Sequence, residues 1–252
     1  AMKARWLAAA LAAPLAPAAL AGAWPQPEDH GFSLNQTGYA MGEAGEGRLL
    51  FDGYGEAGLG GGWTAVFAFD SDLDRATAQS VWRAGGGLRY SLVLDDLPGW
   101  RFSAEATLRY QGHESLIADP AFAGDGLGGG LRLDAGTSFE LFGLPAFADL
   151  GLAWTHRRLA PAETRIELGA GLDLDPSMQV GASYTATFAP GAFYEPGAYE
   201  KHEIQTWTRW RIDADYALSL SVSHTLAADR APVETAIRLG LWTFFYPEPD
   251  AP

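Results

Sequence analysis

The stretch "WRFSAEATLRYQ", Trp100 to Gln111, decides the fold, because its apolar and polar residues alternate without a break. In an extended chain, successive side chains point to opposite faces, so the stretch has one apolar and one polar face. The apolar face carries Trp100, Phe102, Ala104, Ala106, Leu108 and Tyr110, and the polar face carries Arg101, Ser103, Glu105, Thr107, Arg109 and Gln111. This period of two predicts a β-strand.

The alternation alone leaves two fold classes open, because a soluble β-sandwich and a membrane barrel differ only in which face points inward. Aromatic residues, Trp100 and Tyr110, close the apolar row at both ends. About ten residues at roughly 3.3 Å each, tilted by about 40°, span roughly 25 Å, the height of the apolar band of an outer-membrane barrel. We therefore expect this row to face lipid, and Arg101, Glu105 and Arg109 to face a lumen.

Length, charge and the first residues limit the alternatives. The chain has 252 residues, no Cys and a formal net charge of -14, which argues against a basic nucleic-acid surface and excludes a disulfide scaffold. Lys3 and Arg5 precede an Ala/Leu run that ends at small residues, so residues 1–23 are predicted to be a signal peptide. No later apolar run reaches the roughly 18 residues of a transmembrane helix. A Pro-rich segment, residues 24–31, follows the signal peptide.

The alternating pattern recurs along the rest of the chain, and no amphipathic helical period extends beyond about two turns. The pattern predicts about twelve strands. They lie near residues 32–41, 47–58, 62–70, 79–94, 100–111, 126–142, 146–156, 164–174, 178–189, 202–213, 217–226 and 233–245. We expect an all-β chain: a closed antiparallel transmembrane β-barrel over residues 32–245, with residues 246–252 as a periplasmic tail.

The connections between these strands are expected to differ in length at the two ends of the barrel. Tight turns are predicted at 58–61, 95–99, 142–145, 175–178 and 214–217, whereas "GHESLIADPAFAGD" at 112–125 and "APGAFYEPGAYEKH" at 189–202 are long. Short periplasmic turns and longer extracellular loops are typical of outer-membrane barrels, and a sandwich has no reason to separate the two.

Strand parity predicts which side chains line the lumen and which form an aromatic girdle at the membrane interfaces. The predicted lumen residues are Arg101, Glu105, Arg109, Arg132, Asp134, Glu140, Asp149, Arg165, Glu167, Asp173, Arg209, Arg211, Glu234 and Arg238. The predicted girdle consists of Trp100, Tyr110, Trp154, Tyr184, Trp210 and Phe245. The mixed charges favour a narrow, crosslinked interior over a wide pore selective for one charge. Two interpretations stay open: the charges only hold the barrel together, or they form a track for a polar solute.

One short motif invites an enzymatic interpretation. His113-Glu114-Ser115 resembles the His-x-Ser pair of outer-membrane phospholipase A and of lipid A deacylase, in which His activates Ser for attack on an acyl ester. The resemblance covers three residues, and no Asn follows at a distance suited to orient the His. A solvated loop histidine is the competing interpretation. The histidine spacing does not predict a metal site, and no cofactor and no catalytic residue are expected.

Four further segments resemble the XagA-type family of outer-membrane proteins that accompany exopolysaccharide and biofilm genes. They are "AGAWPQPEDHG" after the signal peptide, "FDGYGEAGLGGGWTAVF" at 51–67, "GLGGGLRL" at 126–133 and "AIRLGLWTFF" at 236–245. The resemblance implies a function in the cell envelope, in polysaccharide export or surface organisation, and provides no catalytic residues.

The sequence therefore predicts a non-enzymatic protein of the bacterial outer membrane, most simply a narrow pore or export-associated channel for small polar solutes or polysaccharide. Its expected partners are the lipid bilayer, the barrel-assembly machinery and the solute, with no nucleic acid. Two alternatives remain. One is a surface-organising or adhesive barrel that acts through loops such as "FYEPGAY" at 193–199. The other is an outer-membrane acyl hydrolase.

Overall fold

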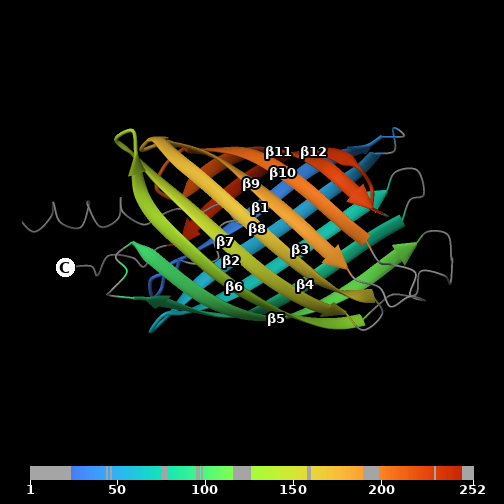
Figure 1. Ribbon diagram of the computed structural model, residues 1–252, viewed down its shortest axis with the longest axis horizontal. Coiled ribbons are helices and arrows are strands. Elements are labelled where there is room, and N and C mark those ends of the chain that lie inside the picture. Colours follow the sequence, from blue (N-terminus) through green and yellow to red (C-terminus); the bar gives the residue numbers. More distant parts are fainter. Residues whose placement is uncertain are drawn as a thin grey trace, which may run out of the picture.

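The computed structural model describes residues 24–43, 45, 47–74, 79–94, 97, 99–115, 126–157, 160–189, 199–229 and 231–245. Within these ranges the chain forms twelve antiparallel strands that wrap obliquely around one axis (Figure 1). The strands are β1 (Gly31–Gly42), β2 (Gly47–Gly60), β3 (Trp63–Asp74), β4 (Gln79–Val93), β5 (Trp100–Ser115), β6 (Gly126–Leu141), β7 (Leu144–Arg157), β8 (Ala160–Asp175), β9 (Met178–Ala189), β10 (Tyr199–Arg211), β11 (Tyr216–Asp229) and β12 (Glu234–Phe245).

The first and last strands pair and close the barrel. Gly31 lies opposite Phe245, and the register continues without a shift to the pair of Gly42 and Glu234. Every other strand pairs with its neighbours in sequence, so no sheet edge is left open. The prediction of a closed antiparallel barrel of about twelve strands is confirmed. The described part of the chain contains no helix that could cross a membrane.

Side chains alternate between an apolar outer face and a mixed inner face, as the pleat of each strand requires. On β5, Trp100, Leu108 and Tyr110 are 41%, 64% and 44% exposed. Ser103 and Arg89, which have the opposite parity on β5 and β4, are buried. The distribution is the reverse of a soluble barrel, because large apolar residues are exposed and charged residues are enclosed.

The two ends of the barrel differ in their connections. We call the end at which β1 begins and β12 ends the turn end, and the opposite end the loop end. The turn end has two-residue connections at 61–62, 142–143 and 176–177. The β6–β7 turn places Phe142 at φ 54° and Gly143 at φ 80°, a backbone that suits a two-residue hairpin.

The difference in connection length is smaller than predicted. Residues 116–125 and 190–198 are the longest connections, and both belong to the loop end, but residues 158–159 make a short connection there, and residues 94–99 a longer one at the turn end. β8 and β10 each begin several residues before their predicted starts, which shortens the loops. The predicted signal peptide, residues 1–23, and the predicted tail, residues 246–252, lie outside the described residues.

Candidate functional site

An aromatic cluster fills the lumen near the turn end. It consists of the buried residues Trp24, Phe32, Leu34, Phe147, Trp207, Ala217, Trp242 and Phe244, with Tyr54 packed against them. We call this cluster the aromatic floor. Its members come from β1, β7, β10, β11 and β12 and from the segment before β1, and in a twelve-stranded barrel β7 lies opposite β1. The floor therefore extends across the lumen from one wall to the other.

Glycines in the wall make room for the floor. A Cβ atom built on Gly181 would lie 2.1 Å from the Trp207 ring, and one on Gly171 would lie 2.4 Å from the Phe147 ring. The rings of Phe147 and Trp207 stack with their centroids 6.3 Å apart. The absence of side chains at these two inward positions is thus what lets large rings lie flat against the wall.

Residues 24–30, which we call the strap, lead into β1 at the turn end, with Trp24 buried and residues 27–29 exposed. Trp24 is 6% exposed and meets Phe147 edge to face, with ring centroids 6.0 Å apart. The backbone N–H of Gln26 donates to Oγ1 of Thr64 over 3.3 Å, and its side-chain amide donates to Oε2 of Glu56 over 2.9 Å. The strap is therefore held both by aromatic packing and by hydrogen bonds to the inner wall.

A buried ion-pair network, centred on Arg89, lies beside the strap. Arg89 reaches Glu56 over 2.8 Å and Glu105 over 2.8 Å, and it donates to the Tyr54 hydroxyl over 2.7 Å. Tyr54 in turn donates to Glu56 over 2.6 Å. The network crosslinks β2, β4 and β5 inside the lumen, and the side chains of Arg89 and Glu56 are 2% and 0% exposed. Burial of two paired charges requires this degree of hydrogen bonding.

A second network, centred on Arg132, continues along the wall. Arg132 pairs with Asp134 over 2.7 Å and with Glu167 over 2.6 Å, which connects β6 to β8. Arg165 is 3.6 Å from Glu167, and Asp149 interacts electrostatically with Arg132. The carboxylates of this wall are thus grouped around one guanidinium.

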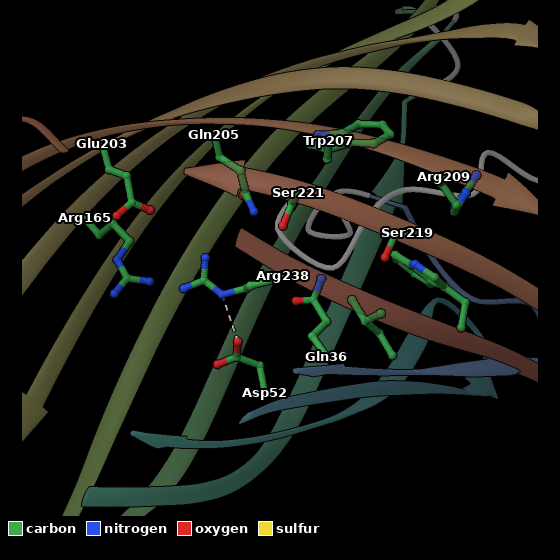
Figure 2. Close-up of a pocket in the computed structure, with 12 residues that line it drawn as sticks. Gln36, Asp52, Arg165, Glu203, Gln205, Trp207, Arg209, Ser219, Ser221 and Arg238 are labelled. Carbon is green, nitrogen blue, oxygen red and sulfur yellow. Dashed lines mark hydrogen bonds and ion pairs between the residues drawn. The ribbon is translucent and has the colours of Figure 1, made fainter. Parts of the chain in front are cut away.

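Further ion pairs lie toward the loop end. Arg48 pairs with Asp72 over 3.2 Å and also with Glu234, which is 3.3 Å from Lys201. Arg238 pairs with Asp52 over 3.1 Å (Figure 2). These pairs connect β12 to β2 across β1, β12 to β10 across β11, and β2 to β3, so charge crosslinks the wall around the seam at which the barrel closes.

Between the aromatic floor and the loop-end ion pairs, the lumen contains a cavity of about 320 Å³. Figure 2 shows Arg165, Gln205 and Arg238 reaching into it from different strands. Its lining residues are Leu34, Gln36, Asp52, Arg165, Glu203, Gln205, Trp207, Arg209, Ser219, Ser221, Arg238 and Trp242. Charged, amide, hydroxyl and indole groups therefore surround one space.

The residues predicted to line the lumen differ in what they contact. The structure places Arg165, Arg209 and Arg238 in the cavity wall and Glu105, Arg132, Asp134, Glu167 and Glu234 in the ion-pair networks. Others have local contacts: Asp149 near Arg132, Asp173 accepting from Gln179 over 2.6 Å, and Arg211 over the Phe244 ring. Arg101 donates to the Trp100 carbonyl at the start of β5, and Glu140 is exposed near the end of β6, so both lie at the turn end. Arg109 is an exposed residue of β5.

The predicted girdle residues lie on the outer face, but not all at its margins. Trp100, Tyr110, Trp154, Trp210 and Phe245 are 39–54% exposed. Tyr184 lies in the middle of β9, is half-buried, and contacts His202 through its hydroxyl. Trp63 and Tyr216, which were not among the predicted residues, are exposed at the turn end of β3 and β11.

Sequence reasoning missed the strap and several lumen groups. Arg48 and Glu203 have the same parity as Asp52 and Gln205 on their strands, so alternation could have found them. Trp24 precedes the first strand and carries no such signal. The His113-Glu114-Ser115 motif ends β5, and its side chains lie outside the described residues, as does most of the segment 193–199. The described residues contain no cluster of side chains that could hold a metal ion.

The closed barrel, with its enclosed charges, defines a protein of the outer-membrane barrel class by fold. Among solved structures, the COG4313 outer membrane channel from Pseudomonas putida F1 matches with a TM-score of 0.60 at 12% identity, over 87% of this chain and 97% of that chain. The NanC porin matches with a TM-score of 0.59 at 11% identity, over 85% and 100%. The β domain of the Bordetella autotransporter BrkA matches with a TM-score of 0.54 at 15% identity, over 86% and 99%. No family model and no curated protein matches the sequence.

Proposed function

We propose that this protein is a narrow, non-enzymatic pore of the bacterial outer membrane for small polar solutes. The observation that carries the proposal is the inverted distribution of side chains: an exposed apolar outer face surrounds a lumen that contains ion pairs and a polar cavity. Lipid requires such an outer face, and a hydrated solute requires such a lumen. The likeness in fold to an outer membrane channel and a porin supports the same function.

In this proposal the turn end faces the periplasm and the loop end faces the outside, as in outer-membrane barrels generally. A solute that enters from the loop end reaches the cavity first and the aromatic floor second. The strap completes the floor through Trp24 and Gln26. We infer that the strap and the floor form the constriction of the pore and that conductance is small.

The test combines membrane fractionation with single-channel recording in planar bilayers. Wild-type protein is expected in the outer-membrane fraction and to give small, weakly selective currents. The double variant Trp24→Ala and Gln26→Ala removes the strap's ring and amide contacts, so its conductance is expected to rise several-fold. Trp63→Ala is the matched control, because Trp63 lies on the outer face at the same end.

Two results would contradict the proposal: recovery of the protein as a soluble periplasmic monomer, or silence of both wild type and strap variant in bilayers. The filled cross-section at the floor favours one second candidate, a surface-organising barrel that acts through its loops. Silence in bilayers, together with loss of surface polysaccharide retention when residues 190–198 are shortened, would support that function. The resemblance to XagA-type proteins points to polysaccharide as its partner.

A further inference from the structure

Four buried polar groups in the cavity wall have no hydrogen-bond partner among the residues that the structure describes. They are the indole nitrogens of Trp207 and Trp242 and the hydroxyls of Ser219 and Ser221. The four residues are 7%, 2%, 7% and 3% exposed, respectively. Buried polar groups are normally hydrogen-bonded, and an indole N–H can only donate. The wall therefore offers at least two donors that need acceptor atoms, beside two hydroxyls that can donate or accept.

The rings of the two tryptophans are already packed against other side chains. The Trp207 ring stacks on Phe147. The guanidinium of Arg209 lies over the Trp242 ring, 5.3 Å from its centroid, and Phe32 packs against the same ring with centroids also 5.3 Å apart. The faces of the two rings are therefore already packed, and the indole N–H groups are what these tryptophans have left to offer a ligand. This arrangement suits a ligand with many oxygen acceptors more than a flat aromatic ligand.

Among the cations around the cavity that form an ion pair within the described residues, Arg165 has the weakest one. Asp52 is held by Arg238 at 3.1 Å, and Glu203 is held by Lys201 at 2.9 Å. Arg165 is 3.6 Å from Glu167 and its side chain is 47% exposed, whereas Glu167 lies closer to Arg132, at 2.6 Å. A carboxylate in the cavity would find in Arg165 a partner suited to a bidentate pair.

We propose that the cavity is a binding site for a small hydroxylated carboxylate, of the size of an acidic monosaccharide. Arg165 pairs with the carboxylate, while the indole N–H groups and the two serine hydroxyls bind ring and hydroxyl oxygens. The volume of about 320 Å³ lies at the lower end of the range for small-molecule sites, which fits a single sugar unit. The proposal deepens the proposed pore function by naming its solute class, and rests on it only in taking the bound molecule as the one that passes.

The test is isothermal titration of the full chain, folded in detergent, with glucuronate, with glucose as the neutral analogue, and with acetate as the carboxylate without hydroxyls. Glucuronate is expected to bind saturably, and at least about tenfold more tightly than glucose or acetate, because each analogue lacks one of the two sets of contacts. The proposal fails if glucuronate gives no saturable heat, or if acetate binds as tightly.

Variants locate the site. Arg165→Gln is expected to reduce the preference for glucuronate over glucose to near unity. Trp242→Phe keeps an aromatic ring, smaller than the indole, and removes the donor. Ser221→Ala removes a hydroxyl with little change in volume, and each variant is expected to weaken glucuronate binding several-fold. Ser91→Ala is the matched control, because Ser91 is also buried with an unpartnered hydroxyl but does not line the cavity. Equal affinity in all four variants would place any binding elsewhere and overturn the proposal.

The binding measurement is independent of conduction, so the two proposals fail separately. If the protein conducts but does not bind glucuronate, the proposed pore function stands and the proposed binding site is wrong. If it binds glucuronate with the expected variant pattern but never conducts, the binding site stands and the pore function is wrong. Heat-modifiable migration on unboiled gels confirms in each case that the variant tested is folded.

Discussion

At the scale of single residues, Arg89 is the most enclosed cation among the described residues of the lumen. It has two carboxylates and a phenol around it. Within the described residues Arg89 is the only cation that pairs with Glu56, because the amide of Gln26 is uncharged. In a buried pair, the loss of one partner costs more than the pair contributes, since the remaining charge stays desolvated.

Arg89→Gln is therefore expected to lower the free energy of unfolding by about 3–5 kcal/mol. The measurement is a urea titration of the refolded barrel, in which heat-modifiable migration on unboiled gels reports the folded fraction. Arg211→Gln is the control, because Arg211 donates to backbone carbonyls at the turn end and is partly solvated, so its loss is expected to cost about 1 kcal/mol or less. Similar losses of unfolding free energy in the two variants would show that the buried Arg89 network stabilises the barrel no more than a partly solvated arginine does.

At the scale of elements, the wall and the floor fit together through glycine. A side chain on Gly181 would collide with Trp207 and with the carbonyl oxygen of Ala170, 2.6 Å away, so neither neighbour could yield cheaply. The residues of the strands around the floor are thus constrained by side-chain volume as well as by the alternation of apolar and polar positions.

Gly181→Val is expected to destabilise the barrel by about 1–3 kcal/mol, because the new methyl groups displace the Trp207 ring. Quenching of tryptophan fluorescence by acrylamide is expected to increase as the floor loosens. The control is Gly129→Ala, at a position on β6 where an added Cβ would meet only ordinary contacts, the nearest at 3.5 Å. Unchanged stability and quenching in Gly181→Val would mean that the floor is not tightly packed.

The β6–β7 turn offers the opposite case, a position that the natural residue fits poorly. Phe142 has φ 54° and is 93% exposed, and a left-handed backbone costs an ordinary L-residue about 1–2 kcal/mol. Phe142→Asn is expected to stabilise the barrel by about 0.5–1 kcal/mol in urea titrations, because Asn tolerates this conformation. The control is Phe139→Asn, in strand β6 before the turn, which is expected to destabilise the barrel. If Phe142→Asn also destabilises the barrel, the Phe142 ring has a role in anchoring the turn.

The strands could be predicted from sequence because a half-buried strand repeats the same local chemistry every second residue. Trp100 to Gln111 gave the orientation of β5, and β9 matches its predicted bounds. Strand parity, however, indicates only the face of the sheet on which a side chain lies. It does not indicate how far along the barrel axis the side chain lies or which residue it pairs with. It therefore could not show that Glu234 meets Arg48, which lies far away in sequence, or that Arg101 turns to a carbonyl at the end of the barrel. The strap was missed for a different reason, since Trp24 and Gln26 lie in no repeating element.

At the scale of the whole molecule, the lumen carries charges of both signs, and two cations, Arg109 and Arg165, have no close ion pair within the described residues. Arg109 has none, and Arg165 has the 3.6 Å contact with Glu167. The two side chains also interact electrostatically with each other. They are therefore the groups most able to act on a passing ion.

The double variant Arg109→Ser and Arg165→Ser is expected to shift the reversal potential of a salt gradient toward cation preference, because carboxylates then dominate the path. The shift should diminish at high salt, where the field of the remaining charges is screened. The matched control is Arg101→Ser with Arg211→Ser, which removes the same charge at the turn end. An equal shift in both variants, or none in a conducting barrel, would contradict a specific role for Arg109 and Arg165.

The position of the strap also has a consequence for the order of assembly. Trp24 lies in the segment before β1, which begins at Gly31, yet it packs on Phe147 of β7, which lies across the lumen. The contact requires the sheet to curve, since five strands separate β1 from β7 in an open ribbon. Contacts between distant segments of a chain tend to form late. We therefore expect the strap to settle late in assembly, and its contacts with Glu56, Thr64 and Phe147 to hold the start of β1 from inside the closed barrel.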